Sequence, residues 1–281
     1  MIEHDAQPKT KLGGAFNTLR LIHVTTAQAV RAKYHHPATG IIISMIQTLI
    51  MILLFVFVIS ALRGKGGGLD RTSPVNGGDI ITFVMSGVFL FRAHNSAIQA
   101  IFSSPGVNSP LTNHQPINST ILLISAGLGE LYTQLLGMSF ILAVYHCAWK
   151  PLNFDNFIGF FIFFLLGWFA GVGIGLFAKA MQPWAPRIIG IAQTLYQRIN
   201  MFSSGKMFLA NSLPGDRRAL FDWNPLFHAI DQARGEAFLN YTPRYTNWEY
   251  PLILALVMLT IGFIGEFYTR QQVSLSWGAT R

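Results

Sequence analysis

The sequence predicts an all-α integral membrane protein with six transmembrane helices, an N-terminal interfacial amphipathic helix and an amphipathic periplasmic segment before the last helix. Of the 281 residues, 51% are hydrophobic and 11% are charged, whereas an average soluble domain carries roughly 25% charged residues. The apolar residues also gather in runs close to the ~20 residues that a helix needs to cross a bilayer. Both observations favour a membrane domain over a soluble one.

Five apolar runs predict membrane spans by their length. Residues 41–62 and 156–178 contain no Asp, Glu, Lys or Arg over 22 and 23 residues, which is long enough to cross the hydrocarbon core. A single charged residue interrupts each of the further runs 80–102, 119–149 and 251–269. We expect all five to span the membrane.

A sixth span is predicted over residues 188–213, which hold several polar side chains among the apolar ones. Charged side chains are costly in lipid and usually face a cavity or a partner. We therefore expect this helix to line a water-filled path. By the same argument, four charges within the spans are candidates for lining a channel: Arg92, Glu130, Arg198 and Lys206. The alternative is that these long side chains reach the membrane surface by snorkelling.

Basic residues around the first span set the predicted orientation. Five precede it, at Lys9, Lys11, Arg20, Arg31 and Lys33, and three follow in the next loop. The positive-inside rule then places the N-terminus in the cytoplasm. Six spans of an inner-membrane, multi-pass protein return the C-terminus to the same side. The predicted divisions are a cytoplasmic tail with an interfacial helix (1–40), a transmembrane domain (41–269) and a C-terminal tail (270–281).

Two segments outside the spans have the apolar spacing of helices. Residues 12–34 predict an interfacial amphipathic helix, with an ordinary solvated helix as the alternative. In the long segment 214–250, Asn224 and Pro225 precede apolar residues at helical spacing. Asn224 suits the N-cap and Pro225 the first helical position, where a missing N–H costs nothing. We expect a short amphipathic helix there, at the outer surface.

The segment 103–116, between the second and third predicted spans, contains three prolines and no Lys or Arg. Prolines stiffen a loop, so this short inner loop is predicted to be a docking element, with a simple turn-rich connector as the alternative. Its candidate contact residues are Pro105, Asn108, Pro110, Asn113, His114 and Pro116.

Catalytic and nucleotide-binding motifs are missing from the sequence. Neither Gly64-Lys65 nor Gly205-Lys206 is followed by Ser or Thr, as a glycine-rich phosphate loop requires. The sequence has no His-Glu-x-x-His or Gly-x-Ser-x-Gly motif, and it has a single cysteine. We therefore predict no catalytic, cofactor-binding or metal-binding residues. Glu130 with His146 is an alternative general-acid pair.

Gly167, Gly171 and Gly175 recur every fourth residue within the run 156–178. Small residues at this spacing let a second helix approach closely. The neighbour is either another helix of the same chain, which we favour, or a second copy of the chain.

Two stretches resemble a known family. Residues 19–34 (LRLIHVTTAQAVRAKY) are similar to the entry segment of the ABC-2 type permeases that export capsule and O-antigen polysaccharides. Residues 223–245 (WNPLFHAIDQARGEAFLNYTPRY) resemble the segment that precedes the last helix in these permeases. The order of predicted helices and loops along nearly the whole chain is similar as well.

This resemblance implies a transport subunit that moves a lipid-linked polysaccharide across the inner membrane. It implies a homodimeric channel and a separate ATP-binding subunit, which would carry ATP and Mg²⁺ and press on the inner loop. Periplasmic and outer-membrane export proteins and membrane lipids would be further partners. It also implies a periplasmic gate, and we name the corresponding residues the gate motif: Trp223, Asn224, Pro225, His228, Asp231 and Arg234.

Three other functions remain as alternatives. An ABC-2 permease could carry a drug or a small lipid, but the Asn-Pro-Leu-Phe-His sequence is against it. The missing motifs are against a membrane enzyme, and the four charges within the spans are against a simple scaffold. A proton-driven transporter would show inverted repeats, which we do not find. The net charge of +8 comes from scattered Lys and Arg residues, so nucleic acid is not an expected partner.

Overall fold

The computed structural model describes residues 11–33, 37–62, 74–75, 78–105, 119–152 and 154–278. Every regular element within these ranges is a helix, as predicted. The α-helices are α1 (Lys11–Lys33), α2 (Pro37–Leu62), α3 (Ile80–Phe102), α4 (Ser119–Ala148), α5 (Phe157–Met181), α6 (Pro186–Ser203), α7 (Gly215–Arg218), α8 (Pro225–Ala237) and α9 (Glu249–Gly278). A short 3₁₀ helix, η3 (Ala210–Ser212), lies between α6 and α7.

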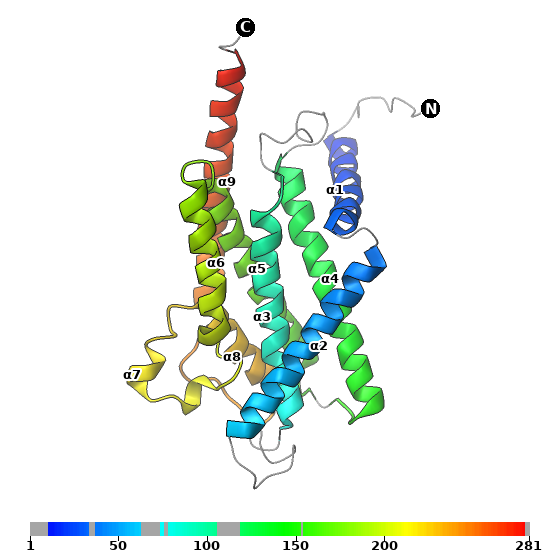
Figure 1. Cartoon of the computed structure of the whole chain (residues 1–281), viewed down its shortest axis with the longest axis vertical. Coiled ribbons are helices and arrows are strands. Elements are labelled where there is room, and N and C mark those ends of the chain that lie inside the picture. Colours follow the sequence, from blue (N-terminus) through cyan, green and yellow to red (C-terminus); the bar gives the residue numbers. More distant parts are fainter. Residues whose placement is uncertain are drawn as a thin grey trace.

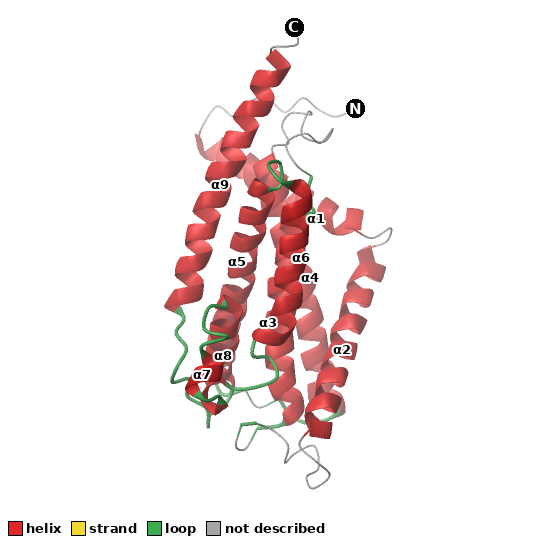
Figure 2. Cartoon of the chain, turned by 60° about the vertical axis from the view of Figure 1, so that its left-hand side comes forward, coloured by secondary structure: helices red, strands yellow, loops and turns green. Residues whose placement is uncertain are grey.

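The long helices form an elongated bundle (Figure 1). Helix α3 lies at its centre and packs against α2, α4, α5 and α8, while α9 packs mainly along α5. Helices α7 and α8 lie at the lower end of the bundle, and the C-terminal part of α9 extends beyond the upper end (Figures 1 and 2). The bundle thus has two distinct ends, which are called lower and upper below.

Four helices are long and apolar enough to cross a membrane, and they coincide with four of the predicted spans. These candidate spans are Thr39–Ala61, Ser119–Ala148, Phe157–Met181 and Glu249–Thr269. Large apolar side chains on α2, such as Ile46, Leu53 and Phe57, are 50%, 59% and 73% exposed. Such a surface is stable when it faces lipid.

The other two predicted spans form helices with less apolar sequences. Helix α3 covers 80–102 as predicted, and most of its residues are buried within the bundle, including His94. Helix α6 ends at Ser203, so the predicted span 188–213 is part helix and part turns. The turn contains Gly205, which has φ of 73°, a conformation that favours glycine. A Cβ on Gly205 would also lie 2.7 Å from the Phe227 ring.

The glycines of α5 allow its neighbours to approach closely. A Cβ on Gly171 would lie 2.4 Å from the carbonyl oxygen of His94, and one on Gly175 would lie 3.0 Å from the Cα of Ile98, both on α3. On another side, a Cβ on Gly173 would lie 2.8 Å from the carbonyl oxygen of Ala255 on α9. The favoured alternative, packing within the chain, is therefore confirmed.

Helix α1 forms where the sequence predicted it and packs against α4. Thr25 and Ser125 share a hydrogen bond between their hydroxyls, 2.5 Å apart, and a Cβ on Gly129 would lie 3.2 Å from the side chain of Val30. Leu19 and Val24 remain exposed. The interfacial position of this helix stays a prediction.

Candidate gate and channel residues

The gate motif lies in and just before α8. This helix begins at Pro225 as predicted, and the Asn224 side chain caps it by accepting a hydrogen bond of 3.0 Å from the backbone N–H of Leu226. However, ten of its thirteen residues are buried, and it packs against α3, α5 and α9. The sequence predicted an amphipathic helix at the surface, but most of α8 is buried. The buried polar side chains of α8 are tolerated because they form hydrogen bonds with the surrounding loops.

Asn224 ties the start of α8 to the end of α6. Its side-chain N–H₂ donates to Asn200 Oδ1 at 2.9 Å and to Ser203 Oγ at 2.8 Å. The residue is fully buried, and all its hydrogen-bonding groups on the side chain are engaged. Trp223, next to it, is 44% exposed, and its carbonyl oxygen accepts a 2.6 Å hydrogen bond from the Tyr250 hydroxyl of α9.

His228 connects the turn before α8 to the segment before α9. Its Nδ1 accepts a hydrogen bond from the backbone N–H of Asn247 at 3.2 Å, so the ring proton belongs to Nε2, which donates to the Asp222 carbonyl oxygen at 2.9 Å. Both ring nitrogens are engaged with backbone groups. The imidazole therefore positions two loops.

Asp231 connects α8 to the 3₁₀ helix η3 and to the segment between α8 and α9. Its Oδ1 accepts from the backbone N–H of Ala210 at 3.3 Å and from the Tyr241 hydroxyl, and its Oδ2 accepts from the Thr246 hydroxyl at 2.8 Å. Burial, together with the neighbouring Asp231 charge, raises the pKa of Tyr241. The phenol consequently remains a donor at every physiological pH.

Arg234 is fully buried and binds the turn that follows α6. Its Nη1 donates to the carbonyl oxygens of Gly205 and Phe208, and its Nη2 donates to that of Lys206, each at 2.7 Å. The guanidinium also lies 3.9 Å from the centre of the Phe83 ring. Burial lowers its pKa to about 10, a fall opposed by the Asp231 charge, so the group stays protonated at pH 7.

Sequence reasoning missed Tyr241, Thr246 and Gly87 as members of this site. A Cβ on Gly87 would lie 2.8 Å from Lys206 and 2.9 Å from Arg234 Nη2, so glycine is needed for the turn to approach α3. Tyr241 lies within the stretch 223–245 that resembles the family, but it was not singled out there, and Thr246 and Gly87 lie outside both quoted stretches. The only signal was the presence of hydroxyl residues in the segment after α8.

The four predicted channel-lining charges lie on α3, α4, α6 and the turn after α6. Arg92 donates to Ser44 Oγ on α2 at 3.0 Å. Glu130 is buried on α4 and accepts from Gln134 at 2.7 Å. Lys206 is buried, donates to the carbonyl oxygen of Met201 and lies 3.7 Å from the centre of the Phe91 ring. Arg198 is exposed on α6.

The alternative acid pair, Glu130 with His146, does not form. Both residues lie on the continuous helix α4, and sixteen residues of helix separate them by roughly 24 Å. His146 is exposed, and its Nδ1 accepts from the backbone N–H of Leu152.

Helices α3 and α6 meet along a row of polar side chains, which we call the polar seam. On α6, Gln193 donates to Gln99 Oε1 and Gln197 donates to the Asn95 carbonyl oxygen, each at 3.0 Å. The seam consists of His94, Asn95 and Gln99 on α3 and Gln193, Tyr196, Gln197 and Asn200 on α6. Among the described residues of α6, only the polar Gln193, Asn200 and Ser203 are buried, whereas Ile188, Leu195 and Phe202 are exposed. The buried side of helix α6 is thus polar, and its exposed side is largely apolar apart from Arg187, Thr194 and Arg198.

At the upper end, the structure describes only the beginning of the predicted docking loop. Pro105 lies three residues after the end of α3, whereas Asn108, Pro110, Asn113, His114 and Pro116 lie outside the described residues. The ammonium of Lys179, near the end of α5, donates to the carbonyl oxygens of Phe102 at 3.1 Å and Ser104 at 2.6 Å. The start of this loop is therefore attached to α5.

Replacing Asn224 with alanine is expected to lower the melting temperature of the purified protein. The change removes the cap of α8, which is typically worth ~1 kcal/mol, and leaves Asn200 and Ser203 without a buried donor. A thermal shift assay in detergent measures the effect. Asn211→Ala is the matched control, because that residue also bonds a neighbouring loop but is less buried; an equal shift in both variants would contradict the prediction.

A buried polar segment, a polar seam and long apolar helices together describe a helical bundle suited to a membrane, and the comparisons identify its family. The chain matches the ABC-2 type transporter family over residues 20–238 and belongs to that family. Among curated proteins, it is similar to a capsule polysaccharide export inner-membrane protein, BexB, of Haemophilus influenzae, with 22% identity over 252 residues that cover 87% of this chain and 89% of that protein. Two further proteins of that name and organism are 21% identical over the same shares.

Proposed function

We propose that this chain is the permease subunit of an exporter that moves a polysaccharide, such as a lipid-linked capsule or O-antigen chain, across the bacterial inner membrane. Membership of the ABC-2 type transporter family and the names of the similar capsule export proteins support this function. The observation that carries it is the polarity of α6, whose buried residues are all polar while most of its large apolar residues are exposed.

In this proposal α3 and α6 complete a set of six spans. Polar residues within membrane helices generally face a path or a partner. The hydroxyl, amide and imidazole groups of the polar seam can each exchange hydrogen bonds with hydroxyl groups of a saccharide. The seam therefore favours a hydroxyl-rich cargo over a drug or small lipid.

The energy for transport comes from a separate ATP-binding subunit, which holds ATP and Mg²⁺, while this chain has no catalytic role. The upper end of the bundle is cytoplasmic in this proposal, and the inner loop after α3 is the docking element. Two copies of the chain form the channel, and the gate motif at the lower, periplasmic end controls its exit. Periplasmic and outer-membrane export proteins receive the glycan there.

Co-purification tests the proposed function. The tagged protein is extracted from its native host in mild detergent, and the bound proteins are identified by mass spectrometry. We expect an ATP-binding subunit at equal stoichiometry and ATPase activity that requires both chains. We also expect deletion of the gene to remove surface polysaccharide. If the chain purifies without an ATPase and surface polysaccharide is unchanged by the deletion, the proposed function is wrong.

A further inference from the structure

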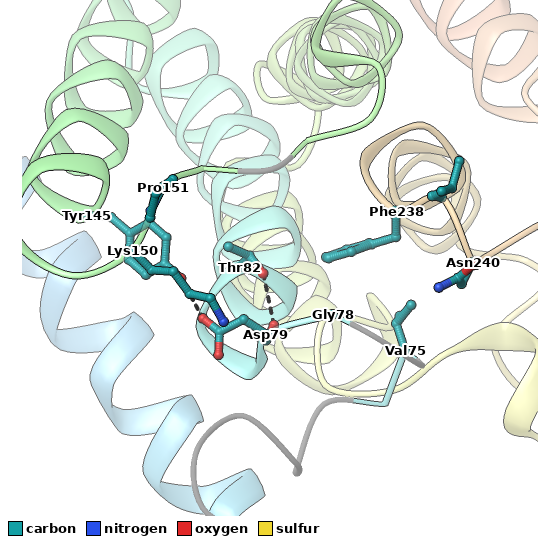
Figure 3. A pocket seen from close by; sticks show the side chains of 10 residues that line it. Val75, Gly78, Asp79, Thr82, Tyr145, Lys150, Pro151, Phe238 and Asn240 are labelled. Carbon is teal, nitrogen blue, oxygen red and sulfur yellow. Dashed lines mark hydrogen bonds between the residues drawn. The ribbon is translucent and has the colours of Figure 1, made fainter.

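A cavity of about 250 Å³ lies at the lower end of the bundle, separate from the gate motif and the polar seam. Three parts of the chain meet around it: the start of α3, the end of α4 with the turn that follows, and the segment directly after α8. Its polar and aromatic lining comes from Asp79, Thr82, Tyr145, Lys150, Phe238 and Asn240 (Figure 3).

Asp79 is the central acceptor of the cavity. The Tyr145 hydroxyl donates to its Oδ2 at 2.6 Å, and the Thr82 hydroxyl donates to its backbone carbonyl oxygen at 2.9 Å. The second carboxylate oxygen, Oδ1, is buried and has no hydrogen-bond partner among the described residues. Asp79 is the residue before α3, but its side chain makes no capping hydrogen bond. The carboxylate is therefore held in place without serving the helix.

The remaining lining combines donors with an apolar wall. In Figure 3 the Lys150 side chain extends toward Asp79, and the Phe238 ring points toward the same group from the opposite side. Asn240 adds an amide, which both donates and accepts hydrogen bonds. The lining holds one carboxylate and one ammonium, so its formal charge is zero. This balance favours a neutral ligand with many hydroxyl groups over a phosphate or a free cation.

The volume limits the ligand to a small one. Pockets for drug-sized ligands measure roughly 300–1,000 Å³, so this cavity holds about one ring with its substituents. Aromatic side chains have an apolar face that packs against the C–H face of a ring, while carboxylates and amides bind hydroxyl groups. Among neutral ligands, a monosaccharide unit combines these two requirements.

We propose that this cavity binds a single neutral sugar unit, with Asp79 as the acceptor for its hydroxyl groups and the small exposed part of Phe238 as an apolar contact for its ring. The proposal rests on the proposed function, in which the lower end is the exit of a glycan exporter. Phe238 is the C-cap residue of α8, and its backbone N–H donates to the Arg234 carbonyl oxygen at 3.0 Å. A bound sugar thus contacts the residue that ends the helix of the gate motif.

Saturation-transfer NMR on the purified full-length chain tests this site. The probes are glucose, galactose, mannose, N-acetylglucosamine and N-acetylgalactosamine, and the detergent must lack a sugar head group. We expect at least one probe to bind the wild type, with affinity reduced about 10-fold or more in Asp79→Ala, as for loss of a hydrogen bond to a charged group. Asp216→Ala is the matched control, because Asp216 is an exposed carboxylate on α7.

A second variant keeps the test valid if Asp79→Ala does not fold. Lys150→Met changes an exposed residue of the cavity, and we expect a similar loss of sugar binding. The proposal is overturned if no probe binds, or if the probes bind both variants as well as they bind the wild type. Native mass spectrometry that finds a phosphatidylethanolamine molecule lost from Asp79→Ala would assign the cavity to a lipid head group instead.

The outcomes separate this proposal from the proposed function. If the ATP-binding subunit co-purifies and the deletion removes surface polysaccharide, but the sugar probes do not bind, only the cavity proposal is wrong. If sugar binding depends on Asp79 but no ATPase or export phenotype is found, the cavity binds sugar in a protein with another function.

Discussion

Replacing Arg234 with methionine is expected to leave almost no folded protein in the membrane. The change removes the donors to the carbonyl oxygens of Gly205, Lys206 and Phe208. Each buried group left without a partner costs about 1–3 kcal/mol. Three such losses are comparable to the roughly 5–15 kcal/mol that holds a typical domain folded.

Fluorescence-detected size exclusion of a tagged protein measures this effect as the amount of monodisperse material extracted from membranes. Arg217→Met is the matched control, because Arg217 lies exposed on α7, and we expect it to resemble the wild type. The yield of Arg234→Lys should fall between those of the two methionine variants. An ammonium keeps the charge but lacks the planar, multi-donor geometry of the guanidinium. A monodisperse Arg234→Met protein with wild-type yield would show that the arginine does not hold the turn.

Replacing Gly171 with alanine is expected to separate α3 from α5 and to destabilise the bundle strongly. The added methyl group would lie 2.4 Å from the His94 carbonyl oxygen and 3.0 Å from the His94 Cα. These are backbone atoms, so the clash cannot be relieved by turning a side chain. Overpacking typically costs about 1–3 kcal/mol, and the shift would also disturb the 2.8 Å hydrogen bond between His94 Nδ1 and the Gly167 carbonyl oxygen.

The melting temperature in detergent measures this effect, and two other glycines provide controls. A Cβ on Gly167 would meet Leu90 at 3.7 Å, which is an ordinary contact, and one on Gly190 would meet nothing within 4 Å. We expect Gly167→Ala to be tolerated and Gly190→Ala, within α6, to be neutral or slightly stabilising because alanine favours a helix. Equal melting temperatures for all three variants would refute the close approach of α3 and α5.

The sequence was sufficient for features that depend on local pattern. Apolar length predicted the four helices that can span a membrane, and Asn224 followed by Pro225 predicted the start of α8. The spacing of Gly167, Gly171 and Gly175 predicted close helix packing. Each of these signals lies within a single element, where geometry depends on neighbours along the chain.

Features that depend on distant neighbours could not be predicted. The periodicity of α8 indicated one buried face, but loops after α6 and α8 supply partners for Asp231 and Arg234 and bury the other face too. The charge of Glu130 gave no information on the partner it would meet in three dimensions. A one-dimensional pattern records which residues are polar but not which backbone groups satisfy them.

The different attachments of α5 and α6 to α3 divide the bundle into a stiff part and a compliant part. Glycines allow α5 to pack closely against the backbone of α3, so separating these two helices would open voids along their length. Lys179 also clamps the end of α3 to α5. Helix α6 is attached through side-chain hydrogen bonds, each worth only about 0.5–1.5 kcal/mol net, and water can replace them one at a time. A force on the loop after α3 would therefore move α3 and α5 together as one rigid unit. Helix α6 would be the helix that shifts most easily relative to them.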